Sequence, residues 1–423
     1  MSVTKAKNFS RYEVFMIALL AILQFTVILD FMVISPLGVI LMKTLQITPT
    51  KFSAVVSAYA FSAGASGLLA AGFADKFDRK KLLLFFYVGF ILGTAMCAIA
   101  PDFNTLLIAR IITGIFGGVI GSVSLAIVTD LFKMEVRGRV MGFIQMAFAA
   151  SQVLGIPIGL VLANNYGWHS CFWMIAIFGA IVGVVMFIYM KPVTGHLNLH
   201  PDRNAFHHLW TTLTKPSYLW GFLTMSFLAS GGFMLMPFGS AFGTHNLGLS
   251  LNQLPLLYLV TGIFSIVFGP VAGRLSDKIG KYKMFCIGSV GAMIAVAIYT
   301  NLGITPFAIA CVVSVLLFAA ITARMVSASA LMTAIPIPQD RGAFMSINSA
   351  VMQISGGAAS VIAGQIVSQS ATGMIQDYDT LGYVVIGTMI VMTAMLYPIN
   401  RSLVAREKGV LAEKSEITTP EIA

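Results

Sequence analysis

The stretch AGFADKFDRKK, residues 71–81, follows directly on an apolar run that is long enough to cross a lipid bilayer. A second stretch, GRLSDKIGKYK at residues 273–283, repeats its pattern of charges later in the chain. Asp75 and Asp277 stand 202 residues apart, and two pairs of lysines keep the same offset. We name these stretches the first clasp and the second clasp. Their repetition predicts a chain built from two related halves.

Composition places the chain in a membrane. Of its 423 residues 58% are hydrophobic and only 10% are charged, and the mean hydropathy is +0.89. Soluble domains carry about 25% charged residues, so lipid must solvate most of these side chains. The net charge of +10 lies in short loops and forms no continuous basic face, which argues against a nucleic-acid partner. The four cysteines lie in apolar runs without disulfide or metal spacing.

Twelve apolar runs predict an all-α polytopic membrane protein with two six-helix pseudo-repeats. We expect a first bundle over 1–190, a cytoplasmic linker over 191–218, a second bundle over 219–403 and a charged, disordered tail over 404–423. The runs are 12–41, 51–74, 82–100, 105–131, 140–165, 168–190, 219–245, 252–272, 284–303, 306–335, 342–368 and 381–402.

The basic residues predict the orientation in the membrane. If the N-terminus is cytoplasmic, 22 of the 26 Lys and Arg residues fall on the cytoplasmic side. The opposite loops hold only Lys43 and Lys51, while Arg110 and Arg324 lie inside apolar runs. The positive-inside rule therefore places both termini in the cytoplasm, with the chain in the inner (plasma) membrane.

The repeat extends beyond the clasps. DFMVISP (30–36) aligns with GFMLMP (232–237), and VRGRVMGF (136–143) aligns with DRGAFMSI (340–347). Two such halves facing each other across a central cavity have the geometry that alternating access requires.

The two clasps resemble the signature of the major facilitator superfamily between helices 2 and 3, with its echo between helices 8 and 9. The resemblance covers essentially the whole chain. The first clasp departs from it at Ala71 and Asp78, where the family usually has glycine. The second clasp matches at Gly273, Leu275, Asp277, Lys278, Gly280 and Lys281, and the first at Ala74, Asp75, Lys76, Arg79 and Lys80.

The charged clasp residues are predicted to gate the cytoplasmic side. Asp75 and Asp277 stand at the cytoplasmic ends of helices 2 and 8, where a carboxylate can cap a neighbouring helix. Arg79 can pair with Asp130 at the end of helix 4, and Lys281 belongs to the second clasp. The alternative is a solvated charge run that only fixes topology.

Asp30 and Arg110 are the predicted proton-coupling pair. Ionisable groups inside the membrane are costly and therefore mark functional sites. Arg110 begins RIITG, which resembles the R-x-x-x-G signature of the superfamily, and Asp30 is the carboxylate deep in an apolar run. Both lie in the outer half of the membrane, because Asp30 is about 27 Å along helix 1. The alternative is a structural ion pair that fixes helix packing.

Helix 5 carries QVLGIPIG (152–159), followed by NYGWHSCFW (165–173). This resembles the helix 5 signature of drug/proton antiporters through Gly155, Pro157 and Gly159, with Gly155 one position out of register. The same G-x-P-x-G variant resembles sugar-efflux-like and drug-efflux-like members with twelve helices, and it points to export. The alternative is a proline kink with small residues for packing.

Further side chains have two open interpretations each. Arg324 could meet an anionic substrate group or reach to the interface. The aromatic and methionine residues could line the substrate cavity or only pack: they are Phe31, Met32, Tyr59, Phe233, Met234 and Tyr258. The linker histidines favour a solvated amphipathic segment over a metal site: they are His196, His200, His207 and His208.

These features favour a monomeric secondary transporter over an enzyme. The sequence lacks a phosphate-binding G-x-x-x-x-G-K-[ST] loop, so we expect no cofactor and a proton gradient as the energy source. The expected activity is proton-coupled efflux of small amphipathic organic molecules or drugs. One alternative is a proton-coupled uptake symporter. The other is a non-transporting receptor or scaffold, which would have little reason to keep a buried carboxylate.

Overall fold

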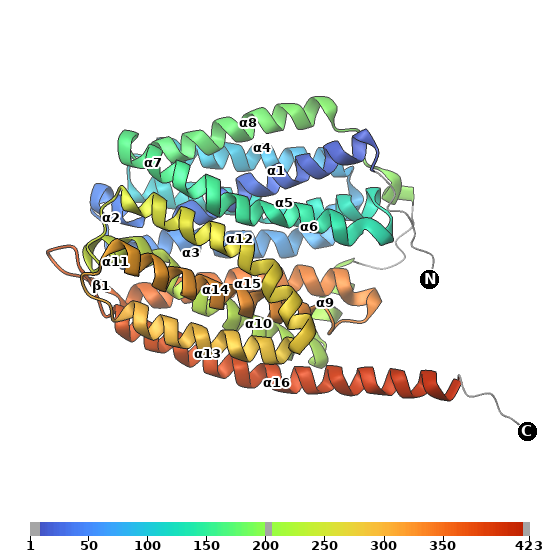
Figure 1. The fold of residues 1–423 in the computed structure, drawn as a ribbon. Helices are drawn as coiled ribbons and strands as arrows, with labels where there is room; N and C mark the ends of the chain where they lie inside the picture. Colours follow the sequence, from blue (N-terminus) through green and yellow to red (C-terminus); the bar gives the residue numbers. More distant parts are fainter. Residues whose placement is uncertain (1–8, 199–204, 418–423) are drawn as a thin grey trace, which may run out of the picture.

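The computed structural model describes residues 9–198 and 205–417. Long helices run nearly parallel through the whole molecule (Figure 1). The first half of the chain contains α1 (Arg11–Val33), α2 (Gly38–Leu45), α3 (Pro49–Phe73), η1 (Ala74–Lys76), α4 (Arg79–Ile99), α5 (Phe103–Leu131), α6 (Met134–Ala150), η2 (Ser151–Gly155), α7 (Ile156–Tyr166) and α8 (His169–Tyr189).

The second half repeats this sequence of elements after a connecting segment that contains η3 (Gly195–Asn198) and α9 (Ala205–Thr214). Its elements are α10 (Pro216–Leu235), η4 (Met236–Phe238), α11 (Gly239–His245), α12 (Gln253–Ile279), α13 (Lys281–Thr300), α14 (Phe307–Met332), η5 (Pro338–Asp340), α15 (Arg341–Ile366), β1 (Ser368–Gln369), β2 (Ile375–Gln376) and α16 (Tyr378–Ile417).

Eleven helical segments of the described chain are long and apolar enough to cross a membrane. The twelfth expected span is α15, a 26-residue helix whose sequence is rich in Ser, Gly, Ala, Asn and Gln. It packs against α3 of the first half and α10 of the second. Because other helices shelter α15, its polar and small residues need not face lipid. The fold is therefore the predicted polytopic all-α architecture.

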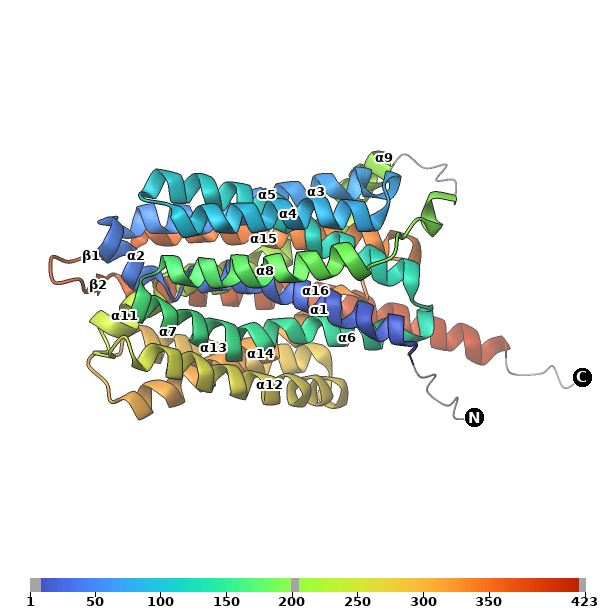
Figure 2. The ribbon, with the colours of Figure 1, turned by 90° about the horizontal axis from the view of Figure 1, so that it is seen from above.

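The two halves form two layers that lie side by side (Figures 1 and 2). Helix α1 begins, and helix α16 ends, at one end of the bundle, which we call the terminus end. The opposite end carries α2, α11 and the short hairpin β1–β2, and we call it the far end. Corresponding elements of the two halves therefore lie at the same end of the bundle, as the sequence repeat predicts.

The first helix of each half breaks at the same place. Pro36 separates α1 from α2, and Pro237 lies in η4 between α10 and α11, because proline lacks the N–H that would continue a helix. These breaks meet at the far end, where the Ser240 hydroxyl donates to the Ser35 carbonyl at 3.0 Å. The aligned stretches 30–36 and 232–237 therefore each lead into a helix break, and the two breaks contact each other.

The far end is where the halves are bonded to each other. Four hydrogen bonds between their described residues lie there. They join Ser240 to Ser35, Thr50 to Gly364, Ser360 to Ser53, and Asn164 to Leu251, with donor–acceptor distances of 3.0, 2.7, 3.4 and 2.8 Å. The structure therefore shows a conformation in which the far end is closed.

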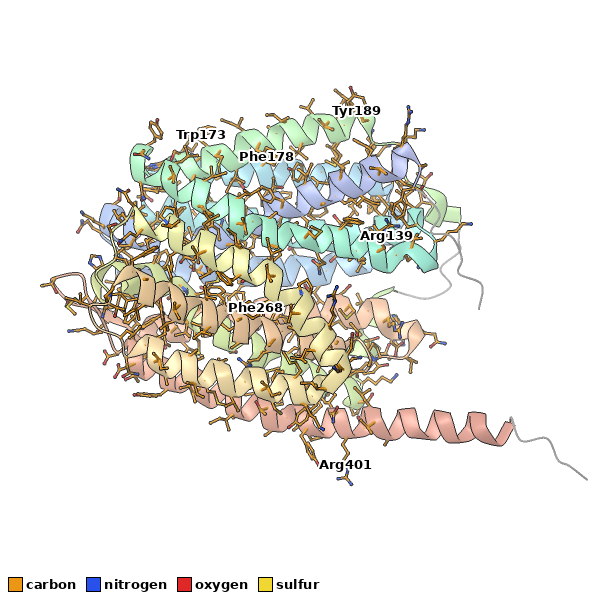
Figure 3. All side chains as sticks on the ribbon, in the orientation of Figure 1. Arg139, Trp173, Phe178, Tyr189, Phe268 and Arg401 are labelled. Carbon is orange, nitrogen blue, oxygen red and sulfur yellow. The ribbon has the colours of Figure 1, made fainter. Side chains whose placement is uncertain are left out.

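The exterior of the bundle suits lipid. Trp173 and Tyr189, near opposite ends of α8, are 43% and 63% exposed (Figure 3). Aromatic residues at both ends of a span match the two interfaces of a bilayer. Arg139 and Arg401 lie at the terminus end, where Figure 3 shows their side chains. We conclude that the chain is a multi-pass membrane protein.

Two expectations about the ends and connections need correction, and one element was not anticipated. The segment predicted as a solvated linker contains α9, which packs against α3, α10 and α15. The tail predicted to be disordered from residue 404 continues α16 to Ile417, since the charged stretch contains no proline. The hairpin β1–β2 between α15 and α16 was not expected, because two-residue strands leave no alternating pattern.

Candidate functional site

Asp30 and Arg110 meet inside the first half, as expected from their depths in α1 and α5. The Arg110 Nη1 donates to Asp30 Oδ2 at 2.6 Å, and both side chains are 0% exposed. Thr94 of α4 donates its hydroxyl to the other carboxylate oxygen at 3.1 Å. Three helices thus bring one carboxylate, one guanidinium and one hydroxyl into a single buried site.

The guanidinium of Arg110 has more donors than this site satisfies. Its Nε and Nη2 are buried and have no hydrogen-bond partner among the described residues. Its Cζ lies 4.5 Å from the centre of the Tyr59 ring, a cation–π arrangement. Buried donors without partners are costly, so this site can accept a further oxygen atom from a ligand or water.

Aromatic rings link the ion pair to the second half. The Phe31 ring, adjacent in sequence to Asp30, lies 5.3 Å from Tyr59 and 5.6 Å from Phe233 of α10. The Phe233 ring in turn lies on Gly356 of α15, where an added Cβ would come within 2.7 Å of the ring. The contacts from Arg110 to α15 are therefore continuous.

The other predicted cavity residues lie elsewhere. Met32 and Met234 are 8% and 3% exposed and belong to the main apolar core. Tyr258 packs against the same core from α12. Phe31, Tyr59 and Phe233 differ from these three in that ring contacts connect them to the ion pair.

Arg324 lies within the second half rather than beside Arg110. Its Nε donates to Ser289 at 3.1 Å, its Nη2 lies 3.6 Å from the Met392 sulfur, and its Cζ lies 5.5 Å from the Phe285 ring centre. These partners come from α13 and α16. The structure thus places Arg324 between three helices of the second half.

In the first clasp, Arg79 contacts Asp130 as expected. Their Nε and Oδ2 atoms are 3.1 Å apart, and the side chains are 5% and 19% exposed. Arg79 also donates Nη1 to the Ala74 carbonyl at 2.8 Å. The pair joins the start of α4 to the end of α5. The side chain of Asp75, the other predicted gate residue here, lies outside the described residues.

Asp78 caps the start of α4. Its Oδ1 accepts from the Lys80 backbone N–H at 2.9 Å, which caps α4, and from the Val193 N–H at 3.0 Å. The Arg79 N–H donates to the Val193 carbonyl at 3.2 Å. The residue that replaces the family glycine therefore fastens the first clasp to the segment that leaves α8.

The second clasp is built differently. Helix α12 runs on to Ile279, and Gly280 turns the chain into α13 with φ of +102°. Glycine adopts this left-handed conformation without a Cβ penalty. Asp277 and Lys281 are exposed, and neither side chain has a hydrogen bond or ion pair with another described residue. The contacts that the second clasp makes to other helices come from uncharged side chains: the Ser327 hydroxyl donates to Ser276 at 3.3 Å, and the Tyr282 hydroxyl donates to the Thr393 carbonyl at 3.2 Å.

The helix 5 motif is a close-packing site in this structure. A Cβ at Gly155 would lie 2.5 Å from Leu29, and one at Gly159 would lie 2.7 Å from the Cys171 sulfur. The turn before Pro157 is the π-helical η2, the kind of irregularity often found at functional sites. Ser151 in η2 donates to the Phe25 carbonyl of α1 at 3.2 Å.

The linker histidines do not gather into one cluster in the described chain. His200 and the side chain of His196 lie outside the described residues, and His207 is exposed. His208 instead approaches Asp340, with Nε2 and Oδ1 3.2 Å apart. Asp340 is part of the aligned stretch 340–347, but its role was not anticipated.

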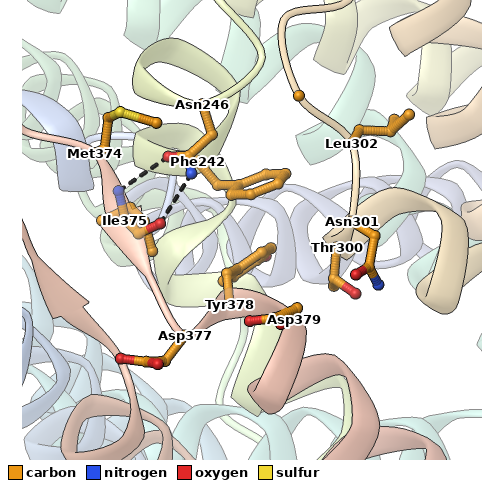
Figure 4. A pocket seen from close by; sticks show the side chains of 11 residues that line it. Phe242, Asn246, Thr300, Asn301, Leu302, Met374, Ile375, Asp377, Tyr378 and Asp379 are labelled. Carbon is orange, nitrogen blue, oxygen red and sulfur yellow. Dashed lines mark hydrogen bonds between the residues drawn. The ribbon is translucent and has the colours of Figure 1, made fainter.

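A hollow of about 320 Å³ opens at the far end within the second half (Figure 4). Phe242 and Tyr378 form one wall, with ring centres 4.2 Å apart. The Asn246 amide is occupied by two hydrogen bonds with the Ile375 backbone, of 2.8 and 2.9 Å. None of the predicted cavity residues lines this hollow.

Sequence reasoning missed Thr94, Asp78 and Asp340. Thr94 is a single hydroxyl in an apolar run, and nothing local distinguishes it from a threonine that bonds its own helix. Asp78 could have been found, because an aspartate directly before a helix is a capping signal.

Comparison with known proteins identifies the family. The sequence model of the Major Facilitator Superfamily matches residues 20–245 and 231–420. The MFS-type transporter YceJ of Bacillus subtilis (strain 168) is 25% identical over 271 residues, which are 63% of this chain and 67% of that protein. Multidrug resistance protein 3 of the same organism is 32% identical over 146 residues, 34% of this chain and 28% of that protein.

A solved structure shares the fold. The bacterial homolog of the human lysosomal transporter Spinster, in an inward-facing and unoccupied conformation, superposes with a TM-score of 0.75 at 15% identity. The match covers 94% of this chain and 99% of that chain. Since the family model matches both halves and the helices adopt the same fold, the chain belongs to the Major Facilitator Superfamily.

Proposed function

We propose that the protein exports small amphipathic organic molecules in exchange for protons. The observation that carries this proposal is the fully buried pair of Asp30 and Arg110, with its unsatisfied guanidinium donors. A carboxylate sealed beside a guanidinium can hold a proton only when its surroundings change. Substrate or water that takes up the free donors of Arg110 would provide that change.

The aromatic contacts explain how the pair could respond to the state of the whole protein. Phe31 adjoins Asp30 and touches Phe233 of the other half. When the halves separate at the far end, this contact must break or shift. The environment of Asp30 would then differ between the two states, which is the requirement for coupling a proton to alternating access.

The orientation completes the proposal. We place the terminus end in the cytoplasm, because most Lys and Arg residues lie there. The closed far end then faces outward, which fits an inward-facing or an occluded state. The Arg79–Asp130 pair is already formed while the far end is closed, so a gating change on the cytoplasmic side would come from the second clasp, whose Asp277 and Lys281 are exposed. Export in particular is supported by the helix 5 motif and by the name of the multidrug resistance relative.

Substrate-driven proton flux in proteoliposomes tests the proposal. A panel of compounds would include a cationic aromatic dye and a neutral aromatic antibiotic. We expect an outward gradient of a transported compound to drive protons in the opposite direction, and Asp30→Asn to abolish proton flux while substrate exchange continues. Protons that move in the same direction as the compound would identify a symporter. If no compound moves, the scaffold alternative gains support.

A further inference from the structure

The carboxylate of Asp340, at the end of η5, has hydrogen-bonding partners on three residues of α9, α10 and the turn between them. Its Oδ2 accepts from the Lys215 ammonium at 2.9 Å and from the Tyr218 hydroxyl at 2.8 Å, and its Oδ1 lies 3.2 Å from His208 Nε2. The Tyr218 hydroxyl also accepts from the Ile337 N–H at 3.2 Å. The carboxylate is only 14% exposed. It therefore fastens α9 and the start of α10 to the start of α15.

The apolar side of α9 reaches the first half of the chain. Leu209 and Leu213 pack against a cluster of Tyr218, Phe222, Phe344 and Ile347, and Leu68 of α3 joins the same cluster. Thr212, on this side of α9, is 2% exposed. Helix α9 lies at the terminus end beside α3 and α15 (Figure 2). It thus covers the place where α3 of one half meets α15 of the other.

The seam between α3 and α15 is closed along most of its length. Near the far end, an added Cβ on Gly364 would overlap Ser53, and further along one on Gly64 would come within 2.7 Å of Ile354. The opposite edge differs, because α12 meets the first half mainly through η2 and α7, with Gly262 against Val153. At the terminus end, the α3–α15 edge of the interface between the halves is therefore packed differently from the α12 edge.

We propose that Asp340 is a positioning residue for the transport cycle: it holds α9 as a brace across the α3–α15 seam. The brace keeps the terminus ends of α3 and α15 together, so that opening at this end is confined to the α12 edge. The charged contacts fix α9 in orientation, while its leucines supply the contact with α3. This role does not depend on whether Asp30 carries the proton.

Cysteine labelling without substrate tests the brace. In a background without the four native cysteines, Thr212→Cys reports the covered side of α9, and Thr211→Cys reports its exposed side. A water-soluble maleimide should label Thr211→Cys rapidly and Thr212→Cys slowly. Adding Asp340→Asn should raise the Thr212→Cys rate at least about tenfold, because charge-assisted hydrogen bonds hold the helix in place. Gln339→Ala, at an exposed position directly beside Asp340, should change neither rate.

A second readout separates positioning from folding. With Asp340→Asn, the maximal transport rate should fall severalfold while the substrate Kd stays the same. Unchanged labelling of Thr212→Cys would overturn the proposal, and so would equal losses of rate and affinity. If Asp340→Asn does not insert, the double variant His208→Gln/Lys215→Met removes two donors and keeps the carboxylate. It should expose Thr212→Cys in the same way, and continued protection there would also overturn the brace.

Discussion

Arg110 has five N–H donors, yet its Nε and Nη2 find no partner among the described residues. A buried guanidinium that served packing alone would be expected to have them satisfied, since each unsatisfied buried donor costs about 1–3 kcal/mol. We therefore infer that these two donors bind an oxygen atom that arrives during transport. Tyr59, whose ring lies 4.5 Å from the Arg110 Cζ, limits where that atom can bind.

Arg110→Lys should separate charge from geometry. Lysine keeps the positive charge but loses the planar fork of donors. We expect substrate Kd to weaken about tenfold or more while the protein still inserts, measured by equilibrium binding in detergent. A matched substitution, Arg324→Lys, should leave binding unchanged because Arg324 lies between helices of the second half. Equal effects of the two substitutions would contradict the assignment of the site.

Gly118 offers a residue-scale test of helix packing. A Cβ there would lie 2.2 Å from the Ala63 carbonyl oxygen, which belongs to the α3 backbone and cannot rotate away. Gly118→Ala should lower the free energy of unfolding by about 1–3 kcal/mol. Gly142→Ala, where no atom lies within 4 Å of an added Cβ, is the control. Thermal unfolding in detergent would show whether only the first variant loses stability.

At the scale of elements, two helix starts carry aspartates with different tasks. Asp78 binds the backbone N–H groups of Lys80 and Val193, while Asp340 binds the side chains of His208, Lys215 and Tyr218. Both tie the segment between the two halves to the helix bundles. This segment is therefore fastened near both of its described ends.

Removing the Asp78 carboxylate should loosen α4 and the segment after α8 together. Asp78→Ala loses the cap, which is worth about 1 kcal/mol, as well as the bond to Val193. Hydrogen exchange should become faster at the first turn of α4 and around Val193, while α13 keeps its protection. Asp78→Gly, which restores the family residue, should lose the bond to Val193 in the same way, while the loss of the cap should cost only a few tenths of a kcal/mol. Unchanged exchange around Val193 would show that Asp78 does not anchor this segment.

The Lys215–Asp340 contact predicts how the docking of α9 depends on pH. The Lys215 hydrogen bond lowers the pKa of Asp340, and the same bond raises the pKa of Lys215. A lowered carboxyl pKa stabilises the folded state above its unfolded value, and this contribution is lost as pH falls. A raised ammonium pKa stabilises it below its unfolded value, and that contribution is lost as pH rises. To isolate this contact from His208, hydrogen exchange of α9 is followed in the His208→Gln variant. Corrected for its intrinsic rate, it should be flat between about pH 5 and 9.

The sequence predicted the helices well because their signals are local. Apolar length gives the spans, and a proline in the first helix of each half marks its break. The sequence also predicted that Asp30 pairs with Arg110 and Arg79 with Asp130, because a charge inside or beside a membrane span has few possible partners. It did not predict α9 docking, Thr94 or the distribution of the cavity residues. These depend on which side of each helix faces which neighbour, and an all-round apolar helix does not encode that orientation.

At the scale of the whole molecule, the far end must open for transport to occur. The Asn164 amide of α7 donates to the Leu251 carbonyl beside α12 at 2.8 Å, directly across the two halves. Cysteines at these two positions, joined by a short bifunctional reagent, should stop transport. Each single cysteine treated with the same reagent should retain activity. Full transport by the joined protein would show that the halves do not separate at this end.

The central claim is that substrate and proton compete through Asp30. The most direct measurement is proton release when substrate binds to the purified protein in weakly buffered detergent solution. The account predicts release from the wild-type protein, and none from Asp30→Asn at the same pH and the same occupancy of bound substrate. Equal proton release from Asp30→Asn and the wild-type protein would contradict it.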